Sequence, residues 1–188
     1  AVARPFLGLD VTINKEAGEE AVTVAPGETA QVTLSWVNNL DTPIQNAVIV
    51  ARLSGLTIPG SSFQTAEGFY RSADKTILFD RTTTKGELAE LRPGARGSVS
   101  FSFTVPAAAD LVSVRDAMVN ITVHAAGKRT GEANVPETLQ STAERSVKLA
   151  SDVRIIGQGF YYQNPFGSVG PLPPRGDQET TYALVFTI

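Results

Sequence analysis

The sequence contains no cysteine and only one histidine, His124, among its 188 residues. The lack of thiols excludes disulfides, thiolate zinc sites and thiol catalysis, and a single imidazole excludes any site that needs two histidines. Long hydrophobic runs are also missing, since the apolar run at 47–51 falls far short of the ~20 residues that a membrane helix needs. Basic residues are not in excess: 16 Lys and Arg are outweighed by 19 Asp and Glu, so nucleic acid is not an expected partner.

What the sequence does have is a globular composition rich in β-branched residues. Hydrophobic residues make up 42% and charged residues 19%, with a net charge of −3, which is typical of a folded domain. A chain of ~150 residues buries roughly 70% of the surface that it exposes when unfolded, so no covalent staple is needed. Val, Ile and Thr account for 47 of the 188 residues, and these residues favour the half-buried surface of a β-sheet.

Apolar residues recur at every second position in several short segments, which is the period of a half-buried strand. Strands are expected at 7–13, 32–37, 47–53, 76–80, 99–105, 119–124, 147–156 and 181–188, with 22–24 extending the first. The polar segment 127–144 is expected as an exposed hairpin or loop, and a helix is conceivable only at 106–118, where Pro106 disfavours it. Short strands separated by turns, without alternating helices, indicate an antiparallel β-sandwich or barrel.

The inward positions of these strands predict one continuous hydrophobic core. Its expected members are Val32, Leu34, Trp36, Val48, Val50, Ile77, Phe101, Phe103, Ile121 and Val123. Trp36 could instead offer a flat ring to a sugar, but its alternation with Val32 and Leu34 favours the core. Burial of each large apolar side chain contributes ~1.5–3 kcal/mol, so this core is expected to supply the stability.

One pattern occurs more than once along the chain. A Pro-Gly turn followed by a strand with three inward apolar residues occurs at 24–36 and again at 91–103, with a looser third copy at 174–186. This spacing predicts residues 1–150 as one domain and residues 151–188 as the opening strands of a second repeat, cut short. The alternative is that 151–188 supplies the final strands of the same sandwich. Because the chain starts with alanine and not methionine, we also expect either that a segment has been removed before it or that it is a piece cut from a longer chain.

The repeated pattern resembles a known family. Pro-Gly-x-x-Ala/Gly-x-Val-x-Leu/Phe-Ser-Trp/Phe, followed by Asn38-Asn39 and the strand at 47–53, is similar to the immunoglobulin-like β-sandwich repeats of large bacterial cell-surface proteins. Segment 88–105 resembles the second half of such a repeat, and 170–174 resembles the opening of the next. The resemblance implies an all-β, immunoglobulin-like antiparallel β-sandwich in a tandem array, export to the cell surface, and a spacer or adhesive role. It brings no catalytic residues.

The densest aromatic cluster lies in the last fifth of the chain, at 160–166. It contains Phe160, Tyr161, Tyr162 and Phe166. Consecutive aromatic residues cannot all face one way on a strand, so some of them must be exposed or packed between domains. We expect a contact surface here, with interdomain packing favoured over a glycan or protein ligand.

The last strand is a second candidate contact site. Tyr182, Leu184, Phe186 and Ile188 alternate along it, and a domain cut short here leaves their strand with unpaired backbone groups. We expect this strand to fold back and pair within the chain, or to pair with a neighbouring molecule by strand addition.

The remaining polar residues give weak signals for a site. His124 is the only base for a Ser–His–Asp arrangement, and its outward position in the alternation predicts an ordinary surface residue. The aspartates that could bind calcium are Asp10, Asp41, Asp74, Asp80 and Asp152, but they lack the spacing of a calcium loop, and turns account for them. Lys75 or Lys148 could crosslink to Asn120 beside an acid, although no spacing demands it.

These features predict a non-enzymatic structural module of an exported bacterial surface protein: a spacer, a stalk, or a component of a surface layer or filament. It is expected to be extracellular and to use no cofactor or metal. Its expected partners are neighbouring repeats or copies of itself, and a glycan or cell-surface protein is a further candidate. The alternative is an adhesive or carbohydrate-binding module that uses the cluster at 160–166, and a third option is an accessory domain of a larger surface enzyme.

Overall fold

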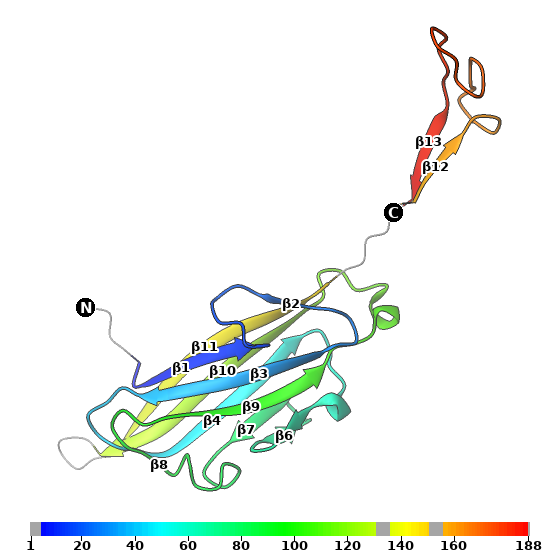
Figure 1. Cartoon of the computed structure of the whole chain (residues 1–188). Helices are drawn as coiled ribbons and strands as arrows, with labels where there is room; N and C mark the ends of the chain where they lie inside the picture. Colours follow the sequence, from blue (N-terminus) through cyan, green and yellow to red (C-terminus); the bar gives the residue numbers. More distant parts are fainter. Residues whose placement is uncertain (1–4, 131–135, 151–155, 188) are drawn as a thin grey trace. The chain divides into compact units, whose positions relative to one another are not determined.

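The computed structural model describes residues 5–130, 136–150 and 156–187. The chain divides into two compact units, Ala1–Ala150 and Ser151–Ile188 (Figure 1). Among the described residues, no helix has the length and apolar character that crossing a membrane requires.

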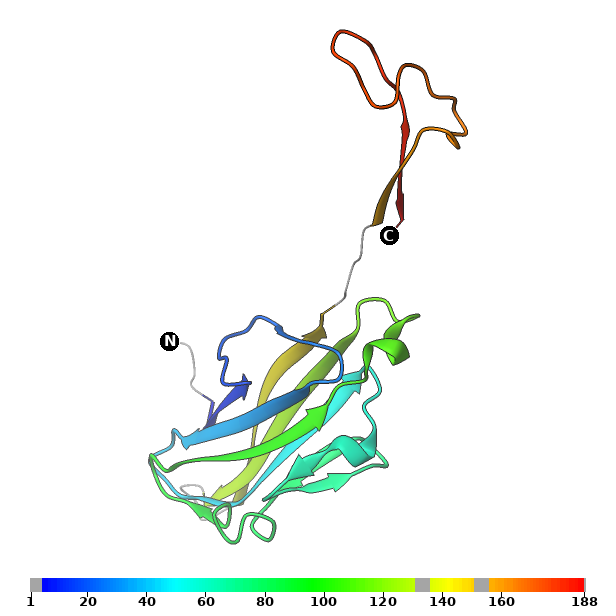
Figure 2. The ribbon, with the colours of Figure 1, turned by 45° about the vertical axis from the view of Figure 1, so that its right-hand side comes forward.

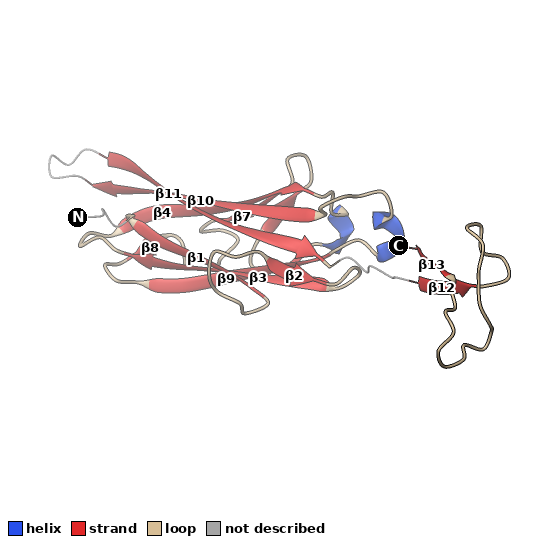
Figure 3. Cartoon of the chain, turned by 90° about the horizontal axis from the view of Figure 1, so that it is seen from above, coloured by secondary structure: helices blue, strands red, loops and turns tan. Residues whose placement is uncertain are grey.

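The first unit is a sandwich of two sheets, seen edge-on as two layers of strands in Figure 3. One sheet has the order β1-β3-β9-β5, and the other has the order β2-β11-β10-β4-β7-β6 with β8 beside β4. The first sheet comprises β1 (Leu7–Ile13), β3 (Thr29–Asn38), β9 (Arg96–Thr104) and β5 (Gln64–Thr65). The second comprises β2 (Val22–Val24), β11 (Pro136–Leu149), β10 (Met118–Thr130), β4 (Ile44–Gly55), β7 (Thr76–Phe79), β6 (Phe69–Arg71) and β8 (Glu90–Leu91). The all-β sandwich expected from the alternating pattern is therefore confirmed.

The two clearest copies of the repeated pattern lie side by side. β3 and β9 pair antiparallel, with Val32 opposite Phe101 and Leu34 opposite Val99 on the buried face. On the outer face, residues with hydroxyl groups stand opposite one another, and Thr33 pairs with Ser100. Each Pro-Gly turn thus leads into a strand with one apolar and one polar face, as an antiparallel sheet with one solvated side requires.

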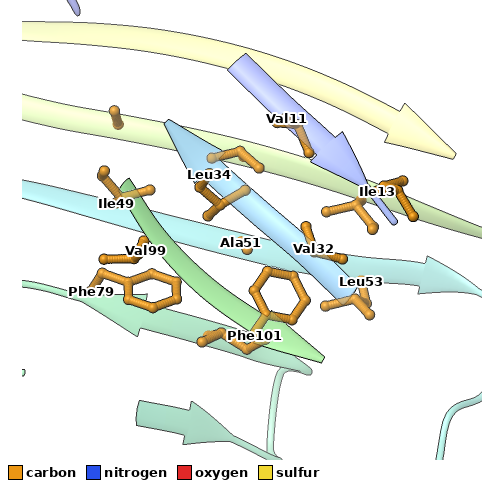
Figure 4. Close-up of a cluster of buried hydrophobic side chains, with 14 of the residues drawn as sticks. Val11, Ile13, Val32, Leu34, Ile49, Ala51, Leu53, Phe79, Val99 and Phe101 are labelled. Carbon is orange, nitrogen blue, oxygen red and sulfur yellow. The ribbon is translucent and has the colours of Figure 1, made fainter. Parts of the chain in front are cut away.

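The core lies between the two sheets, as the close-up of inward side chains in Figure 4 shows. Eight of the expected core residues are buried: Val32, Leu34, Trp36, Ile77, Phe101, Phe103, Ile121 and Val123. The expectation was wrong for Val48 and Val50, which are only half-buried on the outer face, while Ile49 and Ala51 between them point inward and are buried. Every residue of 47–51 is apolar, so alternation alone could not tell which face of this strand is buried.

β2 does not extend β1 into the same sheet, which corrects a second expectation. Asn14 and Lys15 adopt left-handed backbone angles (φ 51° and 69°), and the Glu16 amide donates to the Ile13 carbonyl at 2.8 Å, so the chain turns sharply after β1. β2 then pairs with β11 in the opposite sheet, and this pairing is parallel. The reversal after Ile13 carries the chain from one layer of the sandwich to the other.

Two segments that were expected to be irregular are better defined in the structure. The segment 106–118 holds only a short 3-10 helix, η2 (Ala108–Leu111), and another, η1 (Gly60–Ser62), precedes β5. The hairpin expected at 127–144 is the end of a long antiparallel pair, in which β10 and β11 match from Met118 opposite Lys148 onward. Segment 131–135 lies outside the described residues.

The second unit contains a two-stranded antiparallel sheet, visible from another angle in Figure 2. β12 (Ile156–Phe160) pairs with β13 (Ala183–Thr187), so that Ile156 stands opposite Thr187 and Phe160 opposite Ala183. The long segment between them forms loops. Whether this unit opens a second repeat stays a prediction.

Candidate functional site

Trp36 is packed into the core and does not present its ring to a ligand. Its side chain is 4% exposed, and it lies opposite Gly97 in the β3–β9 pair. A Cβ atom on Gly97 would lie 2.4 Å from Cζ2 of the indole, so only glycine leaves room for the ring. The sugar-stacking alternative for Trp36 is therefore excluded by burial.

Asn38 ties two loops at one end of the sandwich, which sequence reasoning missed. Its Nδ2 donates to the carbonyls of Leu91 (2.8 Å), Thr42 (3.0 Å) and Arg92 (3.2 Å), and its Oδ1 accepts from the Leu40 amide at 2.9 Å. The residue is buried. The signal was its place between a strand and a run of turn residues, where an asparagine side chain bonds nearby backbone.

Arg145 is a buried charge that sequence reasoning also missed. It points into the sandwich from β11, is 5% exposed, and donates from Nη2 to the Glu16 carbonyl at 3.1 Å. Its Nε and Nη1 have no hydrogen-bond partner among the described residues. The available signal was its alternation with Ala143 and the buried Val147. An inward charge on a strand at the edge of a sheet discourages another chain from pairing there.

His124 lies on the outer face of β10 and is exposed, as its position in the alternation predicted. Its Nδ1 lies 3.2 Å from Oγ1 of Thr142, and it borders a hollow of about 220 Å³ together with Val48 and Val50. The hydrogen-bond partner is a hydroxyl group rather than a carboxylate, so the residue pair of a charge-assisted general base is not assembled here.

Two of the candidate aspartates, Asp74 and Asp80, accept hydrogen bonds within their own turns. Arg71 and Thr76 hydrogen-bond the Asp74 carboxylate and lower its pKa to about 2. The amides of Thr83 and Thr82 each donate to Asp80 Oδ1 at 2.8 Å and lower its pKa below the ordinary value. No group of three acidic or imidazole side chains that could hold a metal occurs in the described part of the chain, and Asp152 falls outside it.

The candidate lysine–asparagine crosslink is not assembled either. Oδ1 of Asn120 accepts a hydrogen bond from Oγ of Ser146 at 2.8 Å. Lys75 and Lys148 are exposed, and neither is among the hydrogen-bond partners of the Asn120 side chain.

The aromatic cluster at 160–166 divides into anchored and exposed rings. Tyr161 donates from its hydroxyl to the Gly170 carbonyl and packs edge-to-face on Tyr162, with ring centroids 5.0 Å apart. Tyr162 and Phe166 are 84% and 90% exposed. Asn164 shapes the turn between them, since its Oδ1 accepts from the Phe166 amide at 3.0 Å. The loop therefore presents two rings to solvent on a fixed support.

The candidate edge at 182–188 carries Leu184 and Phe186 on one face of β13 and Val185 on the other. Phe186 lies over Gly157 and Leu184 over Gly159, so the neighbouring strand β12 offers no side chain to cover them. Leu184 is 58% exposed and Phe186 is 63% exposed, and Tyr182 just before the strand is exposed on the same face. Ile188 lies outside the described residues. β13 is paired with β12 on one edge only among the described strands.

Comparison with known proteins adds a likeness in fold. No protein family and no curated protein matches the chain. Among solved structures, the major subunit of aggregative adherence fimbriae type I from Escherichia coli matches with a TM-score of 0.40 and 10% identity, over 77% of this chain and 95% of that one. The seventh ScaB type I cohesin from Pseudobacteroides cellulosolvens matches with a TM-score of 0.42 and 13% identity, over 78% and 94%.

A family 123 glycoside hydrolase from Clostridium perfringens also matches, with a TM-score of 0.44 and 8% identity over 78% of this chain. The chain spans only 28% of that hydrolase. What each of those proteins binds or builds belongs to its own surface residues.

Proposed function

We propose that the chain is a non-enzymatic structural module of an exported bacterial surface protein, a spacer, stalk or filament component that carries tension. The observation that supports this proposal is that the chain enters and leaves the first unit at opposite ends of the sandwich. β1 starts at one end of the sandwich and β11 ends at the opposite end (Figure 1). Tension along the chain therefore acts along the strands.

The pairings that resist such tension lie in a shear geometry. Val22 and Val24 of β2 stand opposite Val147 and Leu149 of β11 in parallel, and the Ala150 amide donates to the Val24 carbonyl at 2.9 Å. Pulling the ends of the unit drags β2 and β11 in opposite directions along a shared axis. The inter-strand hydrogen bonds are then loaded together rather than broken one at a time. β1, paired with β3 along its whole length of seven residues, is loaded in the same way.

Single-molecule pulling between attachment points near residues 5 and 150 tests this proposal. Val24→Pro removes the backbone amide of a residue that faces β11, where its carbonyl accepts from the Ala150 amide, and it should lower the unfolding force, because forced unfolding follows the unfolding barrier of the loaded contacts. Phe69→Pro is the control, since β6 is also a three-residue edge strand but lies outside the path of the load, and the Phe69 side chain is exposed. Equal loss of force in both variants would contradict the proposal.

A second candidate function is adhesion to a glycan through the exposed rings of the 160–166 loop. The observation that favours it is the pair of rings, Tyr162 and Phe166, held clear of the loop by the anchored Tyr161. Aromatic faces of this kind suit the apolar faces of sugars. Glycan-array binding by the full chain that is lost in Tyr162→Ala and Phe166→Ala, but kept in Val169→Ala at another exposed site, would support this function. Absence of binding, or equal loss in all three variants, would exclude it.

A further inference from the structure

The second unit exposes most of the chain's uncovered apolar surface. Of the twelve most exposed large apolar side chains of the described residues, nine lie between Ile156 and Phe186. An apolar surface of this density marks a contact. A two-stranded sheet alone is marginal in water, and it gains stability when a further strand pairs with it.

β13 is the edge that is suited to receive that strand. Its residues, Ala-Leu-Val-Phe-Thr, include β-branched and aromatic types that favour pairing. The other edge belongs to β12, where Gly157 and Gly159 leave one face without side chains to make cross-strand contacts. We propose that β13 pairs antiparallel with β13 of a second copy of this chain, which gives a four-stranded sheet with the order β12-β13-β13-β12.

The absence of charge favours a second copy of the chain as the strand that pairs with β13. Neither β12 nor β13 contains a charged residue, so two copies of β13 meet without like charges standing opposite one another. The long edge of β11 is a poorer partner. Among the described strands, only β2 pairs with that edge, at Val147–Leu149, and the strand carries Glu144 and the buried Arg145. Charged edge strands of this kind resist addition of another strand.

A two-fold axis at Val185 pairs all five residues of β13. In this register Val185 stands opposite its own counterpart, and Leu184 stands opposite Phe186 of the second copy, twice in each dimer. Each pair of an aliphatic and an aromatic side chain covers the flank of Leu184 and Phe186 that faces away from β12. The interface is therefore self-complementary on the face that holds Leu184 and Phe186.

Sedimentation velocity of the full chain over a concentration series tests the interface. Variants that introduce opposite charges at Leu184 and Phe186 also test its register. Leu184→Lys and Phe186→Glu should each weaken the dimer by at least about tenfold, because each variant opposes two charges to apolar side chains. A mixture of the two variants should recover dimer, since the mixed dimer has one Lys–Glu pair and one native Leu–Phe pair. Recovery also shows that the hairpin of each variant is folded. Ile156→Lys makes the same charge change on β12 and should leave dimerisation unchanged.

Three results would overturn this pairing: a wild-type chain that stays monomeric, a mixture that fails to recover the dimer, or a loss with Ile156→Lys that equals the loss with Leu184→Lys. The pulling experiment on the first unit is independent of all three, so this inference and the proposed load-bearing function can fail separately.

Discussion

The two units of the chain differ in the burial of their apolar side chains. The sandwich encloses its strands' apolar residues between two sheets, from Leu7 and Ile13 on β1 to Val147 on β11. The second unit has a single sheet of two strands and leaves Leu184 and Phe186 uncovered on one face. Similar alternating strands therefore have different outcomes, because burial requires a second layer as well as a pattern.

The edges of the two units differ as well. In the sandwich, β11 holds Arg145 inward and is capped at its end by β2. In the second unit neither strand carries a charge. A two-layered sandwich is thus followed along the chain by a small sheet with a free edge. Apolar residues of the first unit stabilise its fold, whereas exposed apolar residues of the second are available for contacts.

Truncating a ring in each unit gives the largest expected contrast. Trp36→Ala should lower the free energy of unfolding of the sandwich by ~3–5 kcal/mol, since it removes a buried aromatic side chain from a close-packed core. Phe186→Ala, on the exposed face of β13, should change that same transition by less than about 0.5 kcal/mol. Urea unfolding followed by far-UV circular dichroism measures both. A cost below about 1 kcal/mol for Trp36→Ala would contradict the placement of the tryptophan in the core.

Gly97→Ala sharpens the packing argument within the sandwich. The added methyl group would meet the indole of Trp36, and relieving that overlap should cost about 1–3 kcal/mol. In a Trp36→Ala background the same change should cost much less, because the ring is gone. A double-mutant cycle by urea unfolding measures the coupling. Additive costs would show that the glycine serves another purpose.

Asn38→Ala and Asn164→Ala compare one residue type in the two units. Removal of the buried Asn38 amide leaves the carbonyl of Leu91 without its donor and should cost the sandwich about 1–3 kcal/mol. Asn164 shapes an exposed loop of the second unit, so its removal should leave the unfolding of the sandwich within about 0.5 kcal/mol of wild type. Thermal unfolding of the two variants side by side checks the difference, and equal costs would contradict it.

Among the variants expected to destabilise the sandwich, Asp80→Ala should cost least, about 1 kcal/mol or less, because it removes an acceptor for two backbone amides in a turn. The pKa of Asp80 is lowered in the folded state, so the carboxylate stabilises the fold above its ordinary pKa of 3.8, and this contribution disappears as the pH falls through the lowered value. The difference in urea midpoint between wild type and Asp80→Ala should therefore be full at pH 6 and shrink below about pH 4. A difference that grows on acidification would contradict this sign.

The sequence predicted the parts of the fold that depend on local alternation. β3 and β9 were expected with the right buried face, because apolar residues alternate there with hydroxyl groups. The phase of β4 was misread, because every residue of 47–51 is apolar. The parallel partner of β2 could not be read, since it depends on a turn after Ile13 that brings together residues more than a hundred positions apart.

The candidate sites show the same limit. Exposed rings in the 160–166 cluster were expected from strand alternation, but Tyr162 and Phe166 lie in the loop that follows β12, so their exposure has another origin. The inward position of Arg145 opposes the usual preference of arginine for water, and only the pairing of β10 with β11, which places it opposite the buried Ile121, reveals it. Long-range strand pairing, rather than residue type, decides whether a side chain such as that of Arg145 points inward.

Hydrogen exchange of the full chain at rising protein concentration tests the contrast between the two units most directly. We expect the amides of β3 and β9 to be strongly protected at every concentration, whereas the amides on the edge of β13 that faces away from β12 gain protection only as copies pair. Protection of β13 that is complete in dilute solution, or rapid exchange throughout β3, would contradict it.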